Sequence, residues 1–160
     1  MPTTFKQQFQ EQGFVIIQGL VQPQDRAELE VACDRVIAKT RSGEWPHRRT
    51  VGKHFPPYGD ADPDSWGVQH VMHPDLEEPA FAQWYTSEPL LTAAKELLEC
   101  KDEDLQMELF NLLINPVSHS FALRWHRDDI SEKATEDEER AALEIWHHGI
   151  QWNTYGLSTH

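Results

Sequence analysis

A strand–turn–strand pattern in residues 105–126 restricts the fold more than any other feature. Residues 105–114 begin with alternating apolar side chains and become almost wholly apolar, as in a strand that is covered on both faces. Asn115-Pro116 is a turn signal. The large apolar side chains of Phe121, Leu123 and Trp125 then alternate with Ala122, Arg124 and His126. Such alternation is typical of a half-buried strand, so this region predicts two strands separated by a turn.

Helical patterns surround these strands. In the predicted helix 22–40, apolar side chains recur at i, i+3, i+4 and i+7 and form one buried stripe. Further helices are expected over residues 5–12, 89–100 and 136–148, and short extended runs predict strands at residues 14–17 and 149–155. A chain of 160 residues has the length of a single domain, and this mixture of elements predicts an α+β fold.

Residues 41–75 lack a helical period and are rich in Gly, Pro, His and aromatic side chains. A segment of this length without regular structure is either functional or disordered. Its aromatic residues argue against disorder, so we interpret it as an ordered lid or pocket wall with a short extended run over residues 67–72. Its basic side chains, in His47-Arg48-Arg49 and Lys53-His54, either hold a carboxylate or phosphate of a substrate or belong to a solvated loop.

The net charge of the chain disfavours some classes of binding partner. Lys and Arg number 14 against 27 Asp and Glu, which gives a net charge of −13. This balance excludes a nucleic-acid binder that works through bulk basic charge and disfavours an anionic membrane surface. No apolar run approaches the ~18 residues of a membrane span, and the first residues lack a signal-peptide pattern. Both cysteines lie in helix-like segments, so we expect no disulfide framework and a reducing, cytoplasmic location.

The sharpest chemical signal is the segment Trp125-His126-Arg127-Asp128. In an extended strand, residues i and i+2 point to the same face, so the imidazole of His126 and the carboxylate of Asp128 would project together. An imidazole and a carboxylate at adjacent coordination positions of a metal ion are also found in the triad of two His and one carboxylate that holds non-haem Fe(II). The tripeptide alone is a weak signal, because a surface His beside an acid is common. The motifs of P-loops, dinucleotide folds, hydrolase elbows and zinc ribbons are absent from the sequence.

Four segments, taken in order, carry a family resemblance: FQEQGFVIIQGLVQPQDRAEL, LFNLLINP, RWHRDDI and GIQWN. They resemble the phytanoyl-CoA dioxygenase-like family of Fe(II)/2-oxoglutarate oxygenases. The first is similar to the family's entry of helix, Gly, strand and helix, and the second to its core strand ahead of the metal motif. The third carries the metal pair, and the fourth is similar to the strand that re-enters the core. The similarity covers essentially the whole chain but only the N-terminal part of a family member.

The resemblance implies a fold and a set of site residues. The fold would be part of a double-stranded β-helix, a jelly roll or cupin-like barrel, with N-terminal helices packed on the sheet. His126 and Asp128 would bind Fe(II), and Leu112 and Trp152 would wall the pocket of the cosubstrate 2-oxoglutarate. His70, in the predicted extended run, is a candidate for the pocket of a small-molecule substrate. The alternative for Leu112, Trp152 and His70 is an ordinary packed residue.

Two functional residues of the family have no counterpart here: a distal His ligand and the Arg that binds the far carboxylate of 2-oxoglutarate. Only 160 − 128 = 32 residues follow Asp128, whereas five further strands would need roughly 35–50 residues. His160 lies outside any similar motif, and His147 and His148 suit the end of a helix. We therefore interpret the chain as a family member truncated at its C-terminus.

Three hypotheses about function remain open. The first is a dioxygenase that hydroxylates an unactivated C–H bond of a small organic substrate and releases succinate from 2-oxoglutarate. The second is a catalytically inactive remnant or binding module, whose open strand edges would favour self-association. The third keeps the barrel but uses Zn or Mn for the chemistry of a cupin-like isomerase or hydrolase.

Overall fold

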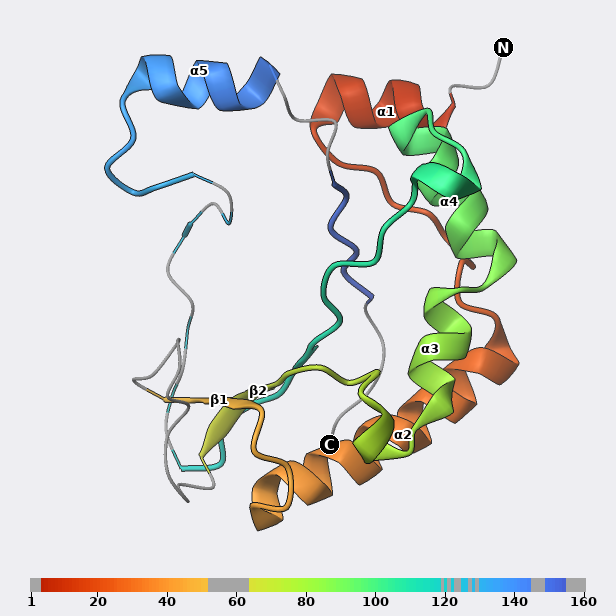
Figure 1. Cartoon of the computed structure of the whole chain (residues 1–160), viewed down its shortest axis with the longest axis vertical. Helices are drawn as coiled ribbons and strands as arrows, with labels where there is room; N and C mark the ends of the chain where they lie inside the picture. The colour runs from red at the N-terminus through yellow and green to blue at the C-terminus, as the bar shows by residue number, and fades with distance from the viewer. Residues whose placement is uncertain are drawn as a thin grey trace. The chain divides into compact units, whose positions relative to one another are not determined.

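The computed structural model describes residues 4–51, 64–118, 120, 122, 125, 126, 128, 130–144 and 149–154. These residues fall into two compact units, one before residue 122 together with Thr154, and one from residue 122 to residue 153. The described part contains five α-helices and a three-stranded antiparallel sheet (Figure 1). This mixture confirms the predicted α+β class.

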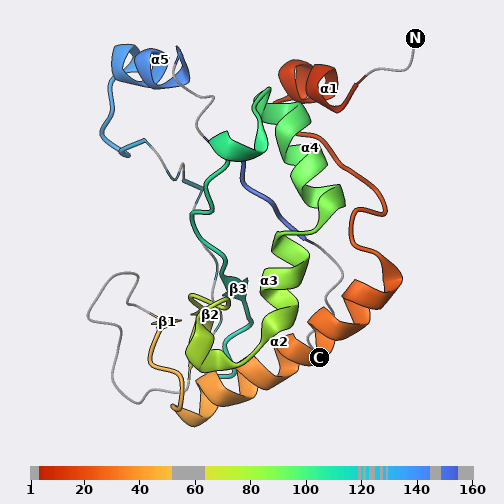
Figure 2. The ribbon, with the colours of Figure 1, turned by 45° about the vertical axis from the view of Figure 1, so that its right-hand side comes forward.

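The first unit contains four of these helices. They are α1 (Phe5–Gln12), α2 (Pro23–Ser42), α3 (Pro79–Tyr85) and α4 (Glu88–Leu98), with short 3₁₀-helices at Pro74–Leu76 and Asp102–Asp104. Figure 2 shows α3 beside α2 and α4 beside α1. The predictions of α1, α2 and α4 are confirmed to within about three residues at each end, whereas α3 has no counterpart among the predicted helices.

Local signals explain where α1 and α2 begin and end. Thr4 and Gln7 form a capping box, in which each side chain accepts a hydrogen bond from the other's backbone amide. Pro23 lies in the first turn of α2, where its missing amide hydrogen removes no helical hydrogen bond. Gly13 and Gly43 end the two helices at φ values of 77° and 85°, a left-handed conformation that glycine adopts without steric cost.

The core of the first unit is built on α2. Its buried side chains are Leu29, Ala32, Cys33, Val36, Ile37 and Thr40. Four of them form the stripe that the sequence predicts, so this part of the core was visible in the apolar periodicity. Buried residues of β2 and α3, among them Trp66, Val68, Phe81 and Trp84, complete this core.

The sheet has the strand order β1-β2-β3 and is antiparallel throughout. β1 is Arg48–Thr50, β2 is Ser65–Val68 and β3 is Leu112–Leu113. Val68 pairs with Arg48 on one side and with Leu112 on the other. All four residues of this central strand are buried. The predicted extended run 67–72 therefore starts two residues earlier than expected and ends at Val68.

Most of the other predicted strands are wrong. Residues 14–17 and 149–154 form no strand, and only Leu112–Leu113 does so in the predicted strand 105–114. Between residues 121 and 126, the described positions Ala122, Trp125 and His126 also lie outside any strand. An apolar run becomes a strand only where a neighbouring strand accepts its hydrogen bonds, and these runs have no such neighbour in the described part. Ile16, 74% exposed, and Leu109, 59% exposed, consequently face solvent rather than a core.

The second unit contains α5 (Glu136–Glu144). Thr135 and Glu138 form the predicted capping box at its start. Residues 145–148, with which the predicted helix ends, lie outside the described residues. No helix of the described part combines the length and the apolar character that a bilayer span requires.

Candidate functional site

His126 and Asp128 lie side by side in the second unit. The Nε2 atom of His126 is 3.2 Å from Oδ1 of Asp128, and the two side chains are 49% and 60% exposed. Neither residue is in a strand, so the expected pleat does not account for their proximity. The imidazole and the carboxylate therefore face each other, and both remain accessible from solvent.

The separation of these two atoms is suited to a shared cation. Two donors that each lie about 2.1 Å from an ion and meet it at a right angle are about 3.0 Å apart. The observed 3.2 Å is close to that value. Among the described residues, no group of three or more His, Cys, Asp or Glu side chains is arranged to hold a metal ion. The described part of the chain thus offers a pair of ligands and not a complete set.

A second His-x-Asp sequence shows that spacing alone does not create this geometry. In His73-Pro74-Asp75, the imidazole Nδ1 is 3.8 Å from the carboxylate Oδ2. That Nδ1 accepts a hydrogen bond from the backbone amide of Asp75 at 3.2 Å, because His73 caps a 3₁₀-helix. Its lone pair is therefore already used, and the residues serve the turn.

Leu112 and His70, the other predicted site residues of the first unit, lie close to the same pair of strands. Leu112 is half-buried in β3 and pairs with Val68. His70 is exposed, follows β2, and donates its backbone amide to Oδ1 of Asn111 at 3.3 Å. This hydrogen bond ties His70 to the residue that precedes β3.

Trp152, the remaining predicted site residue, is half-buried in the second unit. The predicted site residues are thus divided between the two units, with His126, Asp128 and Trp152 in the second. Arg127, which separates His126 from Asp128 in the sequence, and the histidines His147, His148 and His160 lie outside the described residues.

The predicted basic patch does not form as one surface. Arg48 is buried and donates a hydrogen bond to the carbonyl of Thr40 at 3.1 Å. The guanidinium of Arg49 lies over the Trp66 ring, 5.3 Å from its centroid. Lys53 and His54 lie outside the described residues. Strand alternation sends Arg48 into the core, so its charge is structural and does not reach a ligand at the surface.

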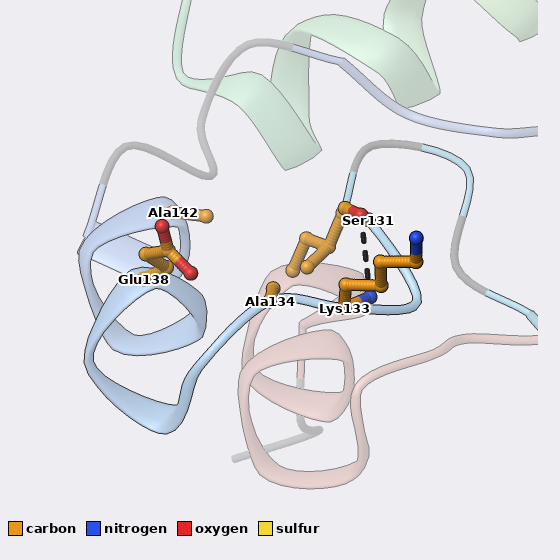
Figure 3. Close-up of a pocket in the computed structure, with 6 residues that line it drawn as sticks. Ser131, Lys133, Ala134, Glu138 and Ala142 are labelled. Atoms are coloured by element: carbon orange, nitrogen blue, oxygen red, sulfur yellow. Dashed lines mark hydrogen bonds between the residues drawn. The ribbon is translucent and has the colours of Figure 1, made fainter.

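The second unit also contains a hollow that is open to solvent (Figure 3). It lies between the turn that carries Ser131 and Lys133 and the helix α5, which contributes Glu138 and Ala142. The polar groups at its wall are engaged locally, since Ser131 Oγ accepts the amide of Lys133 and Glu138 accepts that of Thr135. This hollow offers no arrangement of nucleophile, base or metal donors.

One cluster was missed by sequence reasoning. His47 and His73 lie against the indole of Trp45 in the first unit, and the ring of His70 lies against that of His47. In the sequence, His47 belongs to the predicted basic patch and His70 is a candidate for the substrate pocket, whereas no role is predicted for His73. The spacing of these histidines around two short strands was the available signal, but only the pairing of β1 with β2 brings them together.

The comparisons with known proteins assign no family. No family model, no curated protein and no solved structure matches this chain. Its function therefore has to be inferred from the chain's own residues.

Proposed function

We propose that this protein is a non-haem Fe(II)/2-oxoglutarate-dependent dioxygenase that hydroxylates a small organic substrate, with His126 and Asp128 as two of the iron ligands. The observation that carries the proposal is the 3.2 Å separation of His126 Nε2 and Asp128 Oδ1. It is supported by the sequence resemblance of the segments around these residues to the phytanoyl-CoA dioxygenase-like family.

The chemistry of the two donors suits this metal. A neutral imidazole and an ionised carboxylate are the donor types of the triad that holds non-haem Fe(II) and leaves positions open. When bound, Fe(II) would supply the coordination of 2-oxoglutarate and dioxygen that drives C–H hydroxylation. The part of His126 and Asp128 is to hold the ion at two neighbouring positions, and their exposure leaves room for further ligands.

The proposal also includes a more specific fold than the α+β class, namely part of a double-stranded β-helix. A double-stranded β-helix would use the antiparallel sheet β1-β2-β3 as part of its wall, with the N-terminal helices packed against it. Within that barrel, Leu112 of β3 and Trp152 would wall the cosubstrate, and His70 would face the substrate. These three roles depend on the iron assignment and on the barrel together.

The decisive experiment separates metal binding from turnover. Metal binding is measured anaerobically by calorimetry with Fe(II), and turnover by succinate release from 2-oxoglutarate with a panel of small organic acids and acyl-CoA esters. We expect the wild-type chain to bind Fe(II), and we expect His126→Ala and Asp128→Ala to weaken binding at least about tenfold, as loss of a ligand does.

Asp75→Ala provides the matched control, because Asp75 is the carboxylate of the other His-x-Asp sequence and is 79% exposed. Its Fe(II) affinity should equal that of the wild type. Equal affinity in Asp128→Ala and wild type would refute the ligand role. Tight binding of Zn(II) or Mn(II) without any succinate release would favour the isomerase or hydrolase alternative.

A further inference from the structure

Three imidazoles meet in the first unit, whereas His126 and Asp128, the proposed iron ligands, belong to the second. His47 lies just before β1, His70 follows β2, and His73 caps the 3₁₀-helix that comes next. The ring centroid of His47 is 5.4 Å from that of His70 and 6.2 Å from that of His73. The indole of Trp45 lies against two of them, 4.9 Å from His47 and 5.5 Å from His73.

Backbone hydrogen bonds hold two segments together at this cluster. The amide of Gln69 donates to the carbonyl of His47 at 2.9 Å, and the indole Nε1 of Trp45 donates to the carbonyl of Gln69 at 2.9 Å. A third bond, from the amide of His73 to the carbonyl of His70 at 2.8 Å, closes the turn after β2. The segment 45–47 is thus fastened to the segment 69–73 at the same place where the three imidazoles lie.

The position of His70 is set by its backbone. Its φ of 57° is in the left-handed region, which few residues other than glycine adopt. Asn and His are among the residues that tolerate this region best. With this backbone conformation, the His70 imidazole lies against that of His47.

The charges around the cluster disfavour the protonated form of His70. Partial burial and the neighbouring charges of His47 and His73 lower the pKa of His70 below its ordinary value of 6.5. The Oδ2 atom of Asp75 lies 3.8 Å from Nδ1 of His73. Of the other charged side chains on these segments, Arg48 is directed to Thr40 and Ser65, Arg49 to Trp66, and Glu44 to Ser42.

The arrangement of the three histidines is better suited to taking up protons than to binding a metal ion. His73 uses Nδ1 to accept the amide of Asp75, which places the proton of its neutral form on Nε2. In this state His73 has no free lone pair for an ion. The three rings also fall short of a metal-holding arrangement, since no triad of such donors occurs in the described part of the chain.

We propose that the cluster of His47, His70 and His73 is a proton-sensitive latch, which fastens segment 45–47 to segment 69–73 at neutral pH and loosens on acidification. Protonation puts like charges on rings about 5–6 Å apart, and separation of the two segments relieves their repulsion. Because the open form binds protons more readily, the latch is at full strength above pH 6.5 and weakens as the pH falls below that value.

Hydrogen exchange of two indole N–H groups tests the latch in the full chain. The Trp45 indole reports the latch, and the Trp66 indole, which donates to the carbonyl of Thr50 at 3.1 Å, reports the core nearby. Protection factors are measured by NMR in the presence of EDTA at pH 7.5 and 5.5, corrected for the intrinsic rate, and assigned with Trp45→Phe. We expect protection of Trp45 to fall about 3- to 10-fold, since one group changes an opening equilibrium at most tenfold per pH unit, while Trp66 changes little.

Two variants complete the test. His70→Asn keeps a residue that tolerates the left-handed backbone, and it should reduce the loss at Trp45 to less than about twofold. His47→Gln removes a neighbouring charge, so the ring resonances of His70 should titrate at higher pH than in the wild type. His126→Asn is the control outside the cluster and should behave as the wild type. Equal loss of protection at Trp45 and Trp66, or an unchanged loss in His70→Asn, would overturn the proposal.

Discussion

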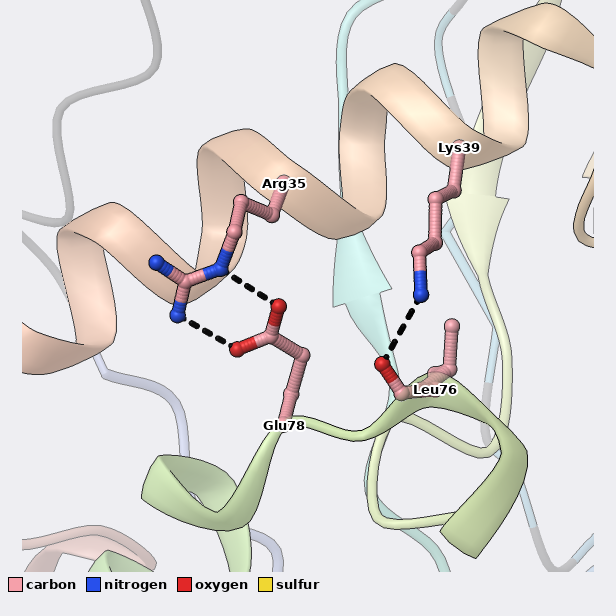
Figure 4. Close-up of polar contacts among 4 residues, drawn as sticks. All are labelled: Arg35, Lys39, Leu76 and Glu78. Carbon is pink, nitrogen blue, oxygen red and sulfur yellow. Dashed lines mark hydrogen bonds and ion pairs between the residues drawn. The ribbon is translucent and has the colours of Figure 1, made fainter.

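The guanidinium of Arg35 on α2 meets the carboxylate of Glu78, at the start of α3, through two parallel hydrogen bonds of 2.5 and 2.6 Å (Figure 4). The Glu78 side chain is only 5% exposed, whereas that of Arg35 is 54% exposed. Lys39, one turn further along α2, donates to the carbonyl of Leu76 at 3.1 Å. Two cations of one helix thus hold the segment that leads into α3.

The first prediction concerns this ion pair. Glu78→Gln keeps the shape of the side chain but removes its charge, and its amide nitrogen cannot accept, so one of the two hydrogen bonds from Arg35 is lost and the other becomes weaker. We expect the free energy of unfolding to fall by about 1–2 kcal/mol, measured by urea denaturation. Arg35→Gln should destabilise the protein more than Glu78→Gln does, because it leaves a buried carboxylate without its partner.

Arg26→Gln is the matched control for that prediction. Arg26 lies on the same helix and pairs with Glu30 across one exposed turn at 2.8 Å. An exposed pair of this kind contributes little, so its loss should change the free energy of unfolding by less than about 0.5 kcal/mol. An equal effect of Arg26→Gln and Glu78→Gln would show that the burial of Glu78 does not matter.

The second prediction concerns the aromatic contact that anchors residues 105–111 to α3. Phe81 is 1% exposed, and its ring meets that of Phe110 edge-on, with the centroids 5.6 Å apart. Phe81→Ala should lower the free energy of unfolding by about 3–5 kcal/mol, because it leaves a cavity in the core. Leu109→Ala, next to Phe110 but 59% exposed, should cost less than about 0.5 kcal/mol in the same denaturation experiment.

Helices α1, α2 and α4 and the start of α5 were predictable because their signals are local, whereas α3 was not predicted. The stripe of α2 lies within one helix, and the left-handed Gly13 and Gly43 mark where α1 and α2 end. A capping box depends on residues three positions apart, as for Thr135 and Glu138 of α5. None of these features needs a partner from elsewhere in the chain, so one sequence is enough to identify them.

The strands were less predictable because a strand depends on its neighbours. Met107 and Leu109 follow the alternation of a strand, yet both are more than half exposed, and Phe110, the residue after Leu109, makes the contact with the core. Of this apolar run, only Leu112–Leu113 pairs with β2. Apolar periodicity indicates that a segment is suited to a sheet, but it does not reveal whether a partner strand is available.

The candidate site residues also differ in whether they depend on local sequence or on distant parts of the chain. The juxtaposition of His126 and Asp128 follows from two positions that are close in the chain, and the structure places the two side chains 3.2 Å apart. The cluster of His47, His70 and His73 depends on the pairing of β1 with β2, which are separated by 14 residues, 51–64. The sequence therefore indicated the pair of His126 and Asp128, although through a strand in which neither residue lies, and it could not indicate the cluster of three histidines.

The third prediction concerns the start of α5. Hydrogen bonds from the backbone amide and the hydroxyl of Thr135 hold the pKa of Glu138 below its ordinary value of 4.5. The unfolded segment takes up its proton at higher pH than the folded one, so this capping interaction is fully stabilising above about pH 4.5 and is lost as the pH falls through the lower folded pKa. A carbon-13 titration of the Glu138 carboxyl should show the lowered pKa directly.

Two variants of the cap separate its contributions. Thr135→Val removes the hydroxyl, and the pKa of Glu138 should rise part of the way to 4.5, because the backbone amide still donates. Glu138→Gln keeps an acceptor but cannot titrate, so the amide shifts of α5 should become less dependent on pH below 4.5. A Glu138 titration that is the same in Thr135→Val and wild type would contradict the role of the hydroxyl.

The last prediction concerns the two free thiols. Burial, together with the charges of Asp34 and Glu30, raises the pKa of Cys33 to about 11, and its side chain is 1% exposed. At pH 8 only about one Cys33 in a thousand is a thiolate, which is the reactive form. Cys100 is half-buried and lies beyond the end of α4, where a reagent has access.

With a chromogenic disulfide reagent at pH 8, one thiol should react within minutes and the second only after denaturant is added. Cys100→Ser should abolish the fast phase, whereas Cys33→Ala should leave it unchanged. A fast phase that persists in Cys100→Ser would mean that the α2 core opens on the timescale of the reaction.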